Sequence, residues 1–401
     1  MIGTDPGPAP RMPMNRPMLE ALAPRAKPAP GAQRPAPATR HPGRRVARPA
    51  RHDSGFWLGL ALLCLPGLTS AGFASSVPLR VELTADAACL VVSPIATPGA
   101  LFVLGAPELS ALAANPRVLL QTNTPLATEL RVPVPLSSGF SNQGFFTAAH
   151  WPGQAPALVN VPAGTFLMGS PDTEVGRFSW EGAQTLVTLT NAFLMGKYEV
   201  TQAEYKALLG SNPSYFSGVS NRPVEQVSWE DAQEYCRRLT TGQRQAGCLP
   251  AGWAYRLPTD AEWEYACRAG TTTPFGYGPD LQSGMANFDG VYEYYGGIGD
   301  VTNPAGVHLW KTVAVGGYAP NAWGLCDMHG NVWEWCLNWW SATLPGGSVT
   351  NPSGPGSGTD HVYRGGCWYN DGRFCRSAYR VHGLPAYRAN DLGFRVVLAP
   401  N

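Results

Sequence analysis

Two carboxylates that could bind a metal ion flank a short turn in the C-terminal half of the chain. Asp327 and Glu334 are seven residues apart, and the Gly-Asn turn between them could direct the carbonyls of Gly330 and Val332 to one side. Oxygen donors of this kind suit calcium, which accepts about six to eight oxygens in a loose geometry. The spacing therefore predicts a calcium site. The alternative is that Asp327 caps a turn while Glu334 forms a salt bridge with an arginine.

The cysteines are the second group of residues that could bind a metal or form covalent bonds. None of the cysteines shows the Cys-x-x-Cys spacing typical of a structural zinc site. In an oxidising compartment we expect most of them to form disulfides. Those that follow the N-terminal apolar run are Cys89, Cys236, Cys248, Cys267, Cys326, Cys336, Cys367 and Cys375.

No other pattern indicates a reaction. The seven histidines are scattered, and His329, which lies inside an aromatic motif, is expected to be structural. The Gly-x-Ser-x-Gly elbow of many serine hydrolases does not occur.

Local signals predict the elements that must position these groups. Three segments place a hydroxyl at a helix start and a carboxylate three residues later, which is the capping-box pattern. They are 201–204, 228–231 and 259–262. In the second helix Cys236 shares an inward face with Ala232 and Leu239, and Cys267 is expected to point inward from the third. Strands are expected at 166–170, 185–189 and 193–196, and loops from 271 to 320.

The N-terminal part divides into three segments. Residues 1–52 are rich in Pro, Ala and Arg and cannot bury a core, so we expect a disordered basic leader. Residues 53–74 contain an apolar run and a small-residue patch, which predicts a signal peptide and export. An uncleaved anchor or a start codon placed too far upstream is the alternative. Residues 77–150 alternate apolar and polar positions, which favours a small β-rich module.

Composition excludes one class of partner. The formal net charge is +1, and the basic residues crowd the first fifty positions, so nucleic acid is not expected. Gly 46, Pro 38 and Trp 13 favour irregular backbone around aromatic anchors over long helices.

Several motifs follow one another in a fixed order along residues 158–397. Together they resemble the formylglycine-generating enzyme, or sulfatase-modifying factor, family. The resemblance implies an α+β domain with much irregular structure, a variant of the C-type-lectin-like fold. It also implies calcium at the Asp327 to Glu334 set, and a second calcium site that begins at Asn287 and Phe288. The motifs are Tyr198 to Thr201, Tyr255 to Ala266, Gly324 to Trp335, Arg364-Gly365-Gly366-Cys367-Trp368, Arg376 to Arg380 and Leu392 to Arg395.

The same resemblance bears on copper. Oxidases of this family convert a cysteine in a Cys-x-Pro-x-Arg segment of a sulfatase to formylglycine, using oxygen and copper(I) held by two thiolates. Copper(I) selects such soft ligands. Here Asn370 stands at the first copper position, Cys375 at the second, and Cys367 where the family has serine. A displaced site would require Cys367 to fold against Cys375.

Disulfides are the expected fate of these thiols. The resemblance implies a bond from Cys267 to Cys375. The second candidate joins Cys336 or Cys326 to Cys367, and the third joins Cys236 to Cys248 across a twelve-residue separation.

Three functions remain open at this point. The first is an exported binding or scaffold module for a peptide or a glycan. The second is an oxidase that acts on a protein cysteine, with a sulfatase as partner. The third is a structural or envelope-associated role dominated by the N-terminal module.

Overall fold

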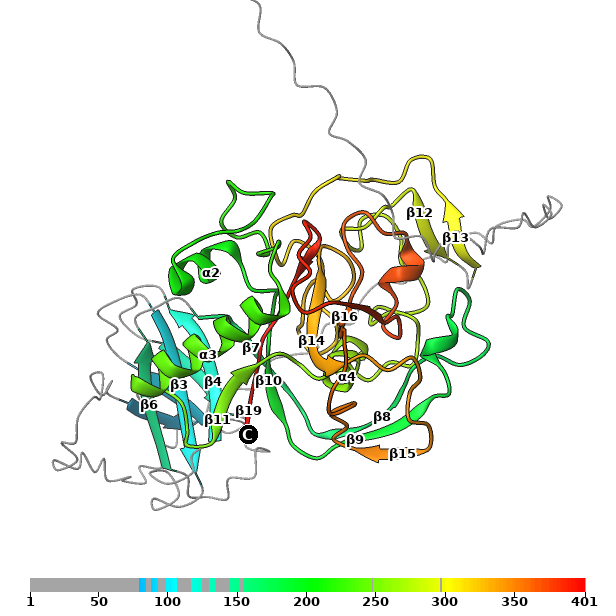
Figure 1. Cartoon of the computed structure of the whole chain (residues 1–401). Coiled ribbons are helices and arrows are strands. Elements are labelled where there is room, and N and C mark those ends of the chain that lie inside the picture. Colours follow the sequence, from blue (N-terminus) through cyan, green and yellow to red (C-terminus); the bar gives the residue numbers. More distant parts are fainter. Residues whose placement is uncertain are drawn as a thin grey trace, which may run out of the picture. The chain divides into compact units, whose positions relative to one another are not determined.

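The computed structural model describes residues 155–246, 248–295 and 298–400, together with the backbone of six strands between 79 and 151. All of them fall within the unit Gly67–Asn401, and Figure 1 shows their helices and strands. The basic leader and the predicted signal peptide lie outside the described residues. Among the residues that the structure describes, no helix is both long and apolar enough to cross a membrane.

Two antiparallel sheets of three strands occupy the segment predicted as a β-rich module. In the first, β2 (Ala88–Val92) lies between β1 (Leu79–Leu83) and β5 (Leu130–Val134). In the second, β3 (Gly99–Ala106) lies between β4 (Arg117–Thr124) and β6 (Phe145–Trp151). The alternating sequence pattern is that of antiparallel strands.

The C-terminal domain is closed by a sheet that joins its two ends. Its strand order is β11 (Trp253–Arg256), β19 (Val397–Pro400), β10 (Phe193–Gly196) and β7 (Leu158–Val161). All of its pairings are antiparallel. The last strand, β19, is therefore hydrogen-bonded to the early strand β10. This pairing fixes the position of the motif arginines that precede β19.

Two further sheets and a hairpin complete the domain. One has the order β17 (Val381–Gly383), β16 (His361–Arg364), β14 (Trp333–Trp339) and β18 (Leu392–Gly393). Another has the order β15 (Ser348–Thr350), β9 (Thr185–Leu189) and β8 (Gly164–Met168). The region predicted as loops contains a hairpin of β12 (Tyr292–Tyr295) and β13 (Ile298–Thr302).

Three α-helices begin where the sequence predicted. They are α2 (Gln202–Leu209), α3 (Trp229–Gln245) and α4 (Asp260–Arg268), and each starts with a complete capping box. Short 3-10 turns occur at η2 (Ser179–Glu181) and η3 (Gly372–Cys375). The inward face predicted for α3 is confirmed, since Ala232, Cys236 and Leu239 are buried.

Buried arginines from the C-terminal motifs connect these elements. Arg364 bonds to Asp260 and Glu264 of α4, and Arg395 of the last motif bonds to Glu334 of β14. The arginine side chains are fully buried, so each guanidinium depends on its carboxylates for compensation. The domain therefore relies on long-range ion pairs as well as on its aromatic core.

Candidate functional site

Cys367 lies in the loop after β16, beneath the surface. Its side chain is fully buried, and its Sγ donates to Oδ1 of Asn370 at 2.8 Å and to Oδ2 of Asp391 at 3.4 Å. Burial raises the pKa of the Cys367 thiol well above its ordinary value. Asn370, which occupies the first copper position of the family pattern, thus serves as a hydrogen-bond acceptor for this thiol.

Cys375 lies at the end of η3 and faces a different part of the core. It packs in a cluster with Phe275, Phe288 and Tyr294, whereas Cys367 belongs to the cluster that contains Trp333. The backbone N–H of Cys367 donates to the Cys375 thiol, and burial raises the pKa of that thiol too. The two cysteines are neighbours through the backbone, but their side chains pack in separate clusters.

The disulfides expected from the sequence are not formed. All seven cysteines of the described C-terminal domain are free and buried. Cys267 contacts Ser377 Oγ at 3.4 Å and His329 Nε2 at 3.6 Å, and no bond joins it to Cys375. The pairs of Cys367 with Cys336 or Cys326, and of Cys236 with Cys248, are likewise absent there. All seven belong to the buried interior, where a small unpaired cysteine behaves largely as a hydrophobic residue.

Alkylation of the native protein by N-ethylmaleimide should leave these seven cysteines unmodified. Burial removes access, and the raised pKa values of the thiols reduce the thiolate that reacts. Unfolding in guanidinium without a reductant should then label all seven, as read by peptide mass spectrometry. A cysteine that is labelled only after reduction would reveal a disulfide and contradict the structure.

Glu334 forms a salt bridge with an arginine, which the sequence analysis gave as the alternative to calcium binding. Arg395 donates to both of its carboxylate oxygens at 2.6 Å, and the Trp263 indole N–H donates to Oε2 at 2.7 Å. Asp327 accepts from the backbone N–H of Gly316 at 2.6 Å, and burial raises its pKa to about 6. Among the described residues, no group of three or more His, Cys, Asp or Glu side chains is arranged to hold a metal ion.

The residues of the second predicted calcium site do approach the first. Asn287 donates from Nδ2 to Asn331 Oδ1 at 3.0 Å, and its carbonyl accepts from the Asn331 N–H at 2.7 Å. A side chain at Gly330 would collide with the Asn287 carbonyl, so this approach requires glycine. Phe288 instead packs beside Cys375.

Glu199 is a buried acid that the sequence analysis did not single out. Its Oε1 accepts from Asn331 Nδ2 at 3.0 Å, while its Oε2, like Oδ1 of Asn287, has no partner among the described residues. Burial and the neighbouring Asp327 carboxylate raise the pKa of Glu199. The side-chain oxygens in this region that lack a hydrogen-bond partner thus belong to Glu199 and Asn287, and not to Glu334. Glu199 sits in a motif, but a lone glutamate gives no signal of its burial.

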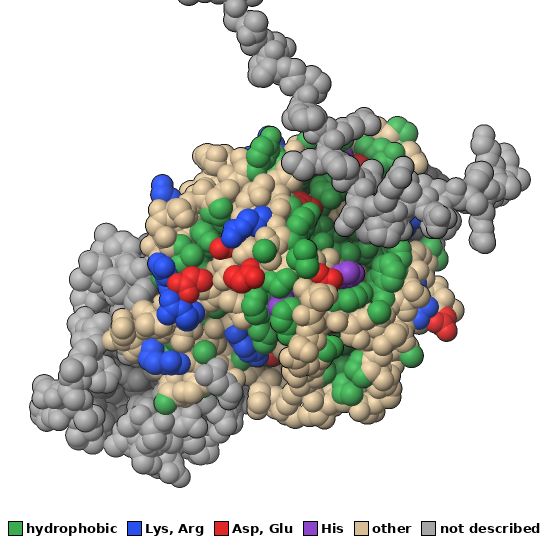
Figure 2. Space-filling view, viewed as in Figure 1, with side chains coloured by type: hydrophobic (Ala, Val, Ile, Leu, Met, Phe, Trp, Pro, Cys, Tyr) green, Lys and Arg blue, Asp and Glu red, His purple; other side chains and the backbone are tan. Residues whose placement is uncertain are grey.

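Aromatic side chains, two of which directly follow Cys367 in the chain, form a connected group that is here called the aromatic cluster. Phe216 meets Trp368 edge-on with ring centroids 5.5 Å apart, and His308 stacks on Trp310 at 3.7 Å. The exposed fractions of Trp310, Tyr215 and Tyr369 are 69%, 63% and 49%. Figure 2 shows that hydrophobic side chains also gather over part of one face of the molecule. The members of the cluster are Tyr215, Phe216, His308, Trp310, Trp368 and Tyr369.

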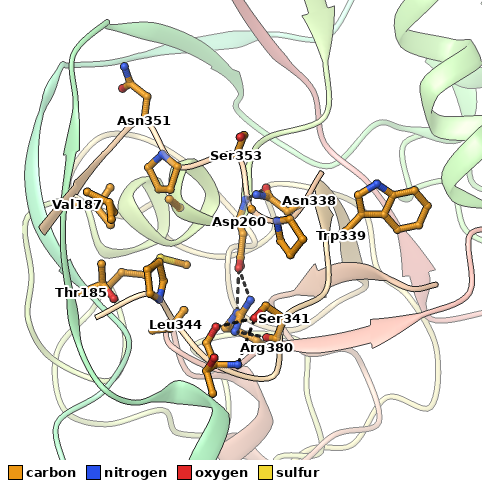
Figure 3. A pocket seen from close by; sticks show the side chains of 18 of the residues that line it. Thr185, Val187, Asp260, Asn338, Trp339, Ser341, Leu344, Asn351, Ser353 and Arg380 are labelled. Atoms are coloured by element: carbon orange, nitrogen blue, oxygen red, sulfur yellow. Dashed lines mark hydrogen bonds and ion pairs between the residues drawn. The ribbon is translucent and has the colours of Figure 1, made fainter. Parts of the chain in front are cut away.

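A cavity of about 520 Å³ lies elsewhere, beside the N-terminal turn of α4. Its wall includes Asp260, which forms an ion pair with Arg380, and side chains of the 341–355 loop (Figure 3). The Asp260 carboxylate already forms ion pairs with both Arg380 and Arg364. None of the site residues predicted from the sequence lines this cavity.

Comparison with known proteins identifies the domain. Residues 145–400 match the family model described as Sulfatase-modifying factor enzyme 1-like domain. The Formylglycine-generating enzyme of Mus musculus is 30% identical over 294 residues, which are 59% of this chain and 74% of that protein. The Chaperone protein LppX of Paenibacillus barcinonensis is 33% identical over 249 residues, which are 53% of this chain and 81% of that protein.

Among solved structures, PvdO from Pseudomonas aeruginosa is 29% identical, covers 61% of this chain and 94% of its own, and has a TM-score of 0.49. The predicted fold class, α+β with much irregular structure in a C-type-lectin-like variant, is confirmed by the family match and the observed elements. The chain belongs to the sulfatase-modifying factor family, with its domain over residues 145–400.

Proposed function

We propose that this protein is an exported binding module of the family, and that it does not oxidise cysteine with copper. The observation that carries the proposal is the arrangement of Cys367 and Cys375. Both thiols are fully buried, and they pack in separate clusters. Copper(I) would need both sulfurs to converge and to lose their protons. Asn370 at the first copper position offers an amide in place of a thiolate.

The aromatic cluster is the surface that we assign to ligand binding. Trp310 and Tyr215 are largely exposed, while Trp368 is nearly buried. Large aromatic rings provide much contact area and a polar edge, and they dominate the energetics of many protein interfaces. A peptide segment of a partner protein is the ligand that such a surface favours. A sulfatase segment is the first to test, and a glycan is the second.

The names of relatives support more than one activity in this family. A Formylglycine-generating enzyme and a Chaperone protein both match this chain at similar identity. Because an enzyme and a chaperone share this fold, function has to be inferred from the residues of the site. The site of this chain lacks the first copper cysteine of the family pattern, which favours the binding role.

A displaced oxidase site is the second candidate. The observation in its favour is that the Cys367 N–H donates to the Cys375 thiol, so the two residues are already adjacent. A rotation of both side chains could then bring the sulfurs to one metal ion. Such a rotation would remove Cys375 from its contacts with Phe275 and Tyr294.

One assay separates the two candidates. The reduced protein is incubated with copper(I), oxygen and a Cys-x-Pro-x-Arg peptide, and mass spectrometry searches for the aldehyde. We expect no product from the natural chain or from Cys375→Ala. Product that requires both Cys367 and Cys375 would exclude the proposed binding-only role.

Binding is measured in parallel by titrating the same peptide against tryptophan fluorescence. Trp310→Ala should weaken binding by about fivefold or more, because loss of an aromatic hot-spot side chain costs more than about 1 kcal/mol. Tyr292→Ala is the matched control, since Tyr292 is also exposed but lies outside the aromatic cluster. Equal loss in both variants would remove the cluster as the binding surface.

A further inference from the structure

Glu225 is a fully buried acid that contacts the 211–219 loop, which follows α2. Its Oε1 accepts from the backbone N–H of Phe216 at 2.8 Å, and the N–H of Tyr215 also donates to this carboxylate. The backbone N–H of Glu225 donates to Ser214 Oγ at 3.1 Å. Oε2 of Glu225 has no partner among the described residues. One carboxyl group therefore holds the part of the loop that carries two members of the aromatic cluster.

The charged neighbours of the Glu225 carboxyl group are one acid and one base. Asp391 is a neighbouring carboxylate, and it accepts hydrogen bonds from the Cys367 thiol and the Tyr369 hydroxyl. Arg222 is the nearby cation, and its Nη1 donates to the Phe216 carbonyl at 3.3 Å. Within the described part of the chain, neither Glu225 nor Asp391 forms an ion pair with an arginine or a lysine. An ionised Glu225 would thus hold a buried charge that nothing pairs.

We propose that protonation of Glu225 controls the position of the 211–219 loop. In its neutral form the carboxyl group accepts the two loop amides and holds Phe216 against Trp368, whose ring centroid is 5.5 Å away. In its ionised form the group gains more from water than from the buried position, so the loop opens. Opening removes Tyr215 and Phe216 from the aromatic cluster. The effect on ligand binding rests on the proposed function, whereas loop opening itself does not.

The direction of the effect follows from the two states of the group. In the closed loop, burial raises the pKa of Glu225 from 4.5 to about 7, with Asp391 adding to the rise and the amide hydrogen bonds and Arg222 opposing it. In an open loop the group is in water and returns to its ordinary pKa of 4.5. Because the closed state has the higher pKa, closure is fully favoured below about pH 4.5 and is lost as the pH rises through about 7.

Hydrogen exchange of the full chain measures this without a ligand. Protection of the Tyr215 and Phe216 amides, corrected for the chemical exchange rate, should fall roughly fiftyfold between about pH 5 and pH 8. Glu225→Gln keeps a neutral acceptor of the same shape, so its protection should not change with pH. An equal fall in Glu225→Gln, or constant protection in the natural chain, would overturn the proposal.

Two further variants keep the test decisive if Glu225→Gln fails to fold. Asp391→Asn removes the neighbouring negative charge, so the midpoint of the fall in protection should move to lower pH. Glu234→Gln changes an exposed glutamate on α3 and should reproduce the natural profile. An unchanged midpoint in Asp391→Asn would contradict the role assigned to the acidic surroundings of Glu225. Peptide binding that fails at every pH would contradict the proposed function and leave the loop result standing.

Discussion

Replacement of Arg395 by methionine should lower the free energy of unfolding by about 3–5 kcal/mol, because it leaves a buried carboxylate without its partner. Arg395 and Glu334 are both almost completely buried, and two bonds of 2.6 Å join them. Asp327 and Glu199 are further buried acids in the same region, and burial raises the pKa of both. Urea unfolding followed by tryptophan fluorescence measures the loss.

Variants of the partner test the electrostatic origin of this loss. Arg395→Met combined with Glu334→Gln should recover much of the stability, since it removes the unpaired charge as well. Arg395→Lys should recover little, because an ammonium cannot reproduce the two-point contact. If the double variant is as unstable as Arg395→Met, lost packing and not charge would be the cause. As a control, loss of the exposed pair partner Arg237 on α3 should change little.

The same unfolding experiments test whether calcium binding in this region stabilises the domain. Glu334 is neutralised by Arg395, but Glu199 and Asn287 keep unpaired oxygens. Stabilisation of the natural chain by millimolar calcium, lost in Asp327→Ala, would support the calcium prediction made from the sequence. Stabilisation that appears only in Arg395→Met would show that the guanidinium takes the place of the cation.

The elements that depend on local signals were predicted well. The three capping boxes place α2, α3 and α4 where the sequence indicated, because the bonds involved span three residues. The hairpin of β12 and β13 was not predicted. Its strands lie in a stretch rich in Gly and Tyr, where turn signals hide short strand pairings.

The candidate site could be predicted only in part, because its contacts are distant in sequence. The partner of Glu334 is 61 residues away, so the spacing of Asp327 and Glu334 could not distinguish a metal ligand from an ion pair. Glu225 reaches its loop from nine residues away, yet nothing in its neighbours marks it as buried. The sequence predicted Cys367 and Cys375 as the cysteines of a displaced copper site, and this stays a prediction. Only the structure shows that their side chains pack in separate clusters.

Replacement of Gly366 by alanine is expected to destabilise the domain by about 2–5 kcal/mol. Gly366 has φ of +75°, where an L-residue costs roughly 1–2 kcal/mol. A Cβ there would lie 2.5 Å from the Cys375 sulfur and 3.0 Å from its Cα. Overpacking of this kind adds roughly 1–3 kcal/mol. Thermal and urea unfolding measure the sum.

Two comparisons separate the backbone effect from the clash. Gly324→Ala places alanine at φ of +90° where a Cβ meets nothing within 4 Å, so it should show the backbone cost alone. The double variant Gly366→Ala with Cys375→Ala removes the sulfur. Its loss of stability should therefore fall between the losses of Gly324→Ala and Gly366→Ala. If Gly366→Ala costs no more than Gly324→Ala, Cys375 must be able to move aside. A mobile Cys375 would also make a rotation toward Cys367 feasible, so this result would strengthen the displaced copper site. A large difference between the two variants would instead show that the second glycine of the motif fixes Cys375 in the core, away from any shared metal.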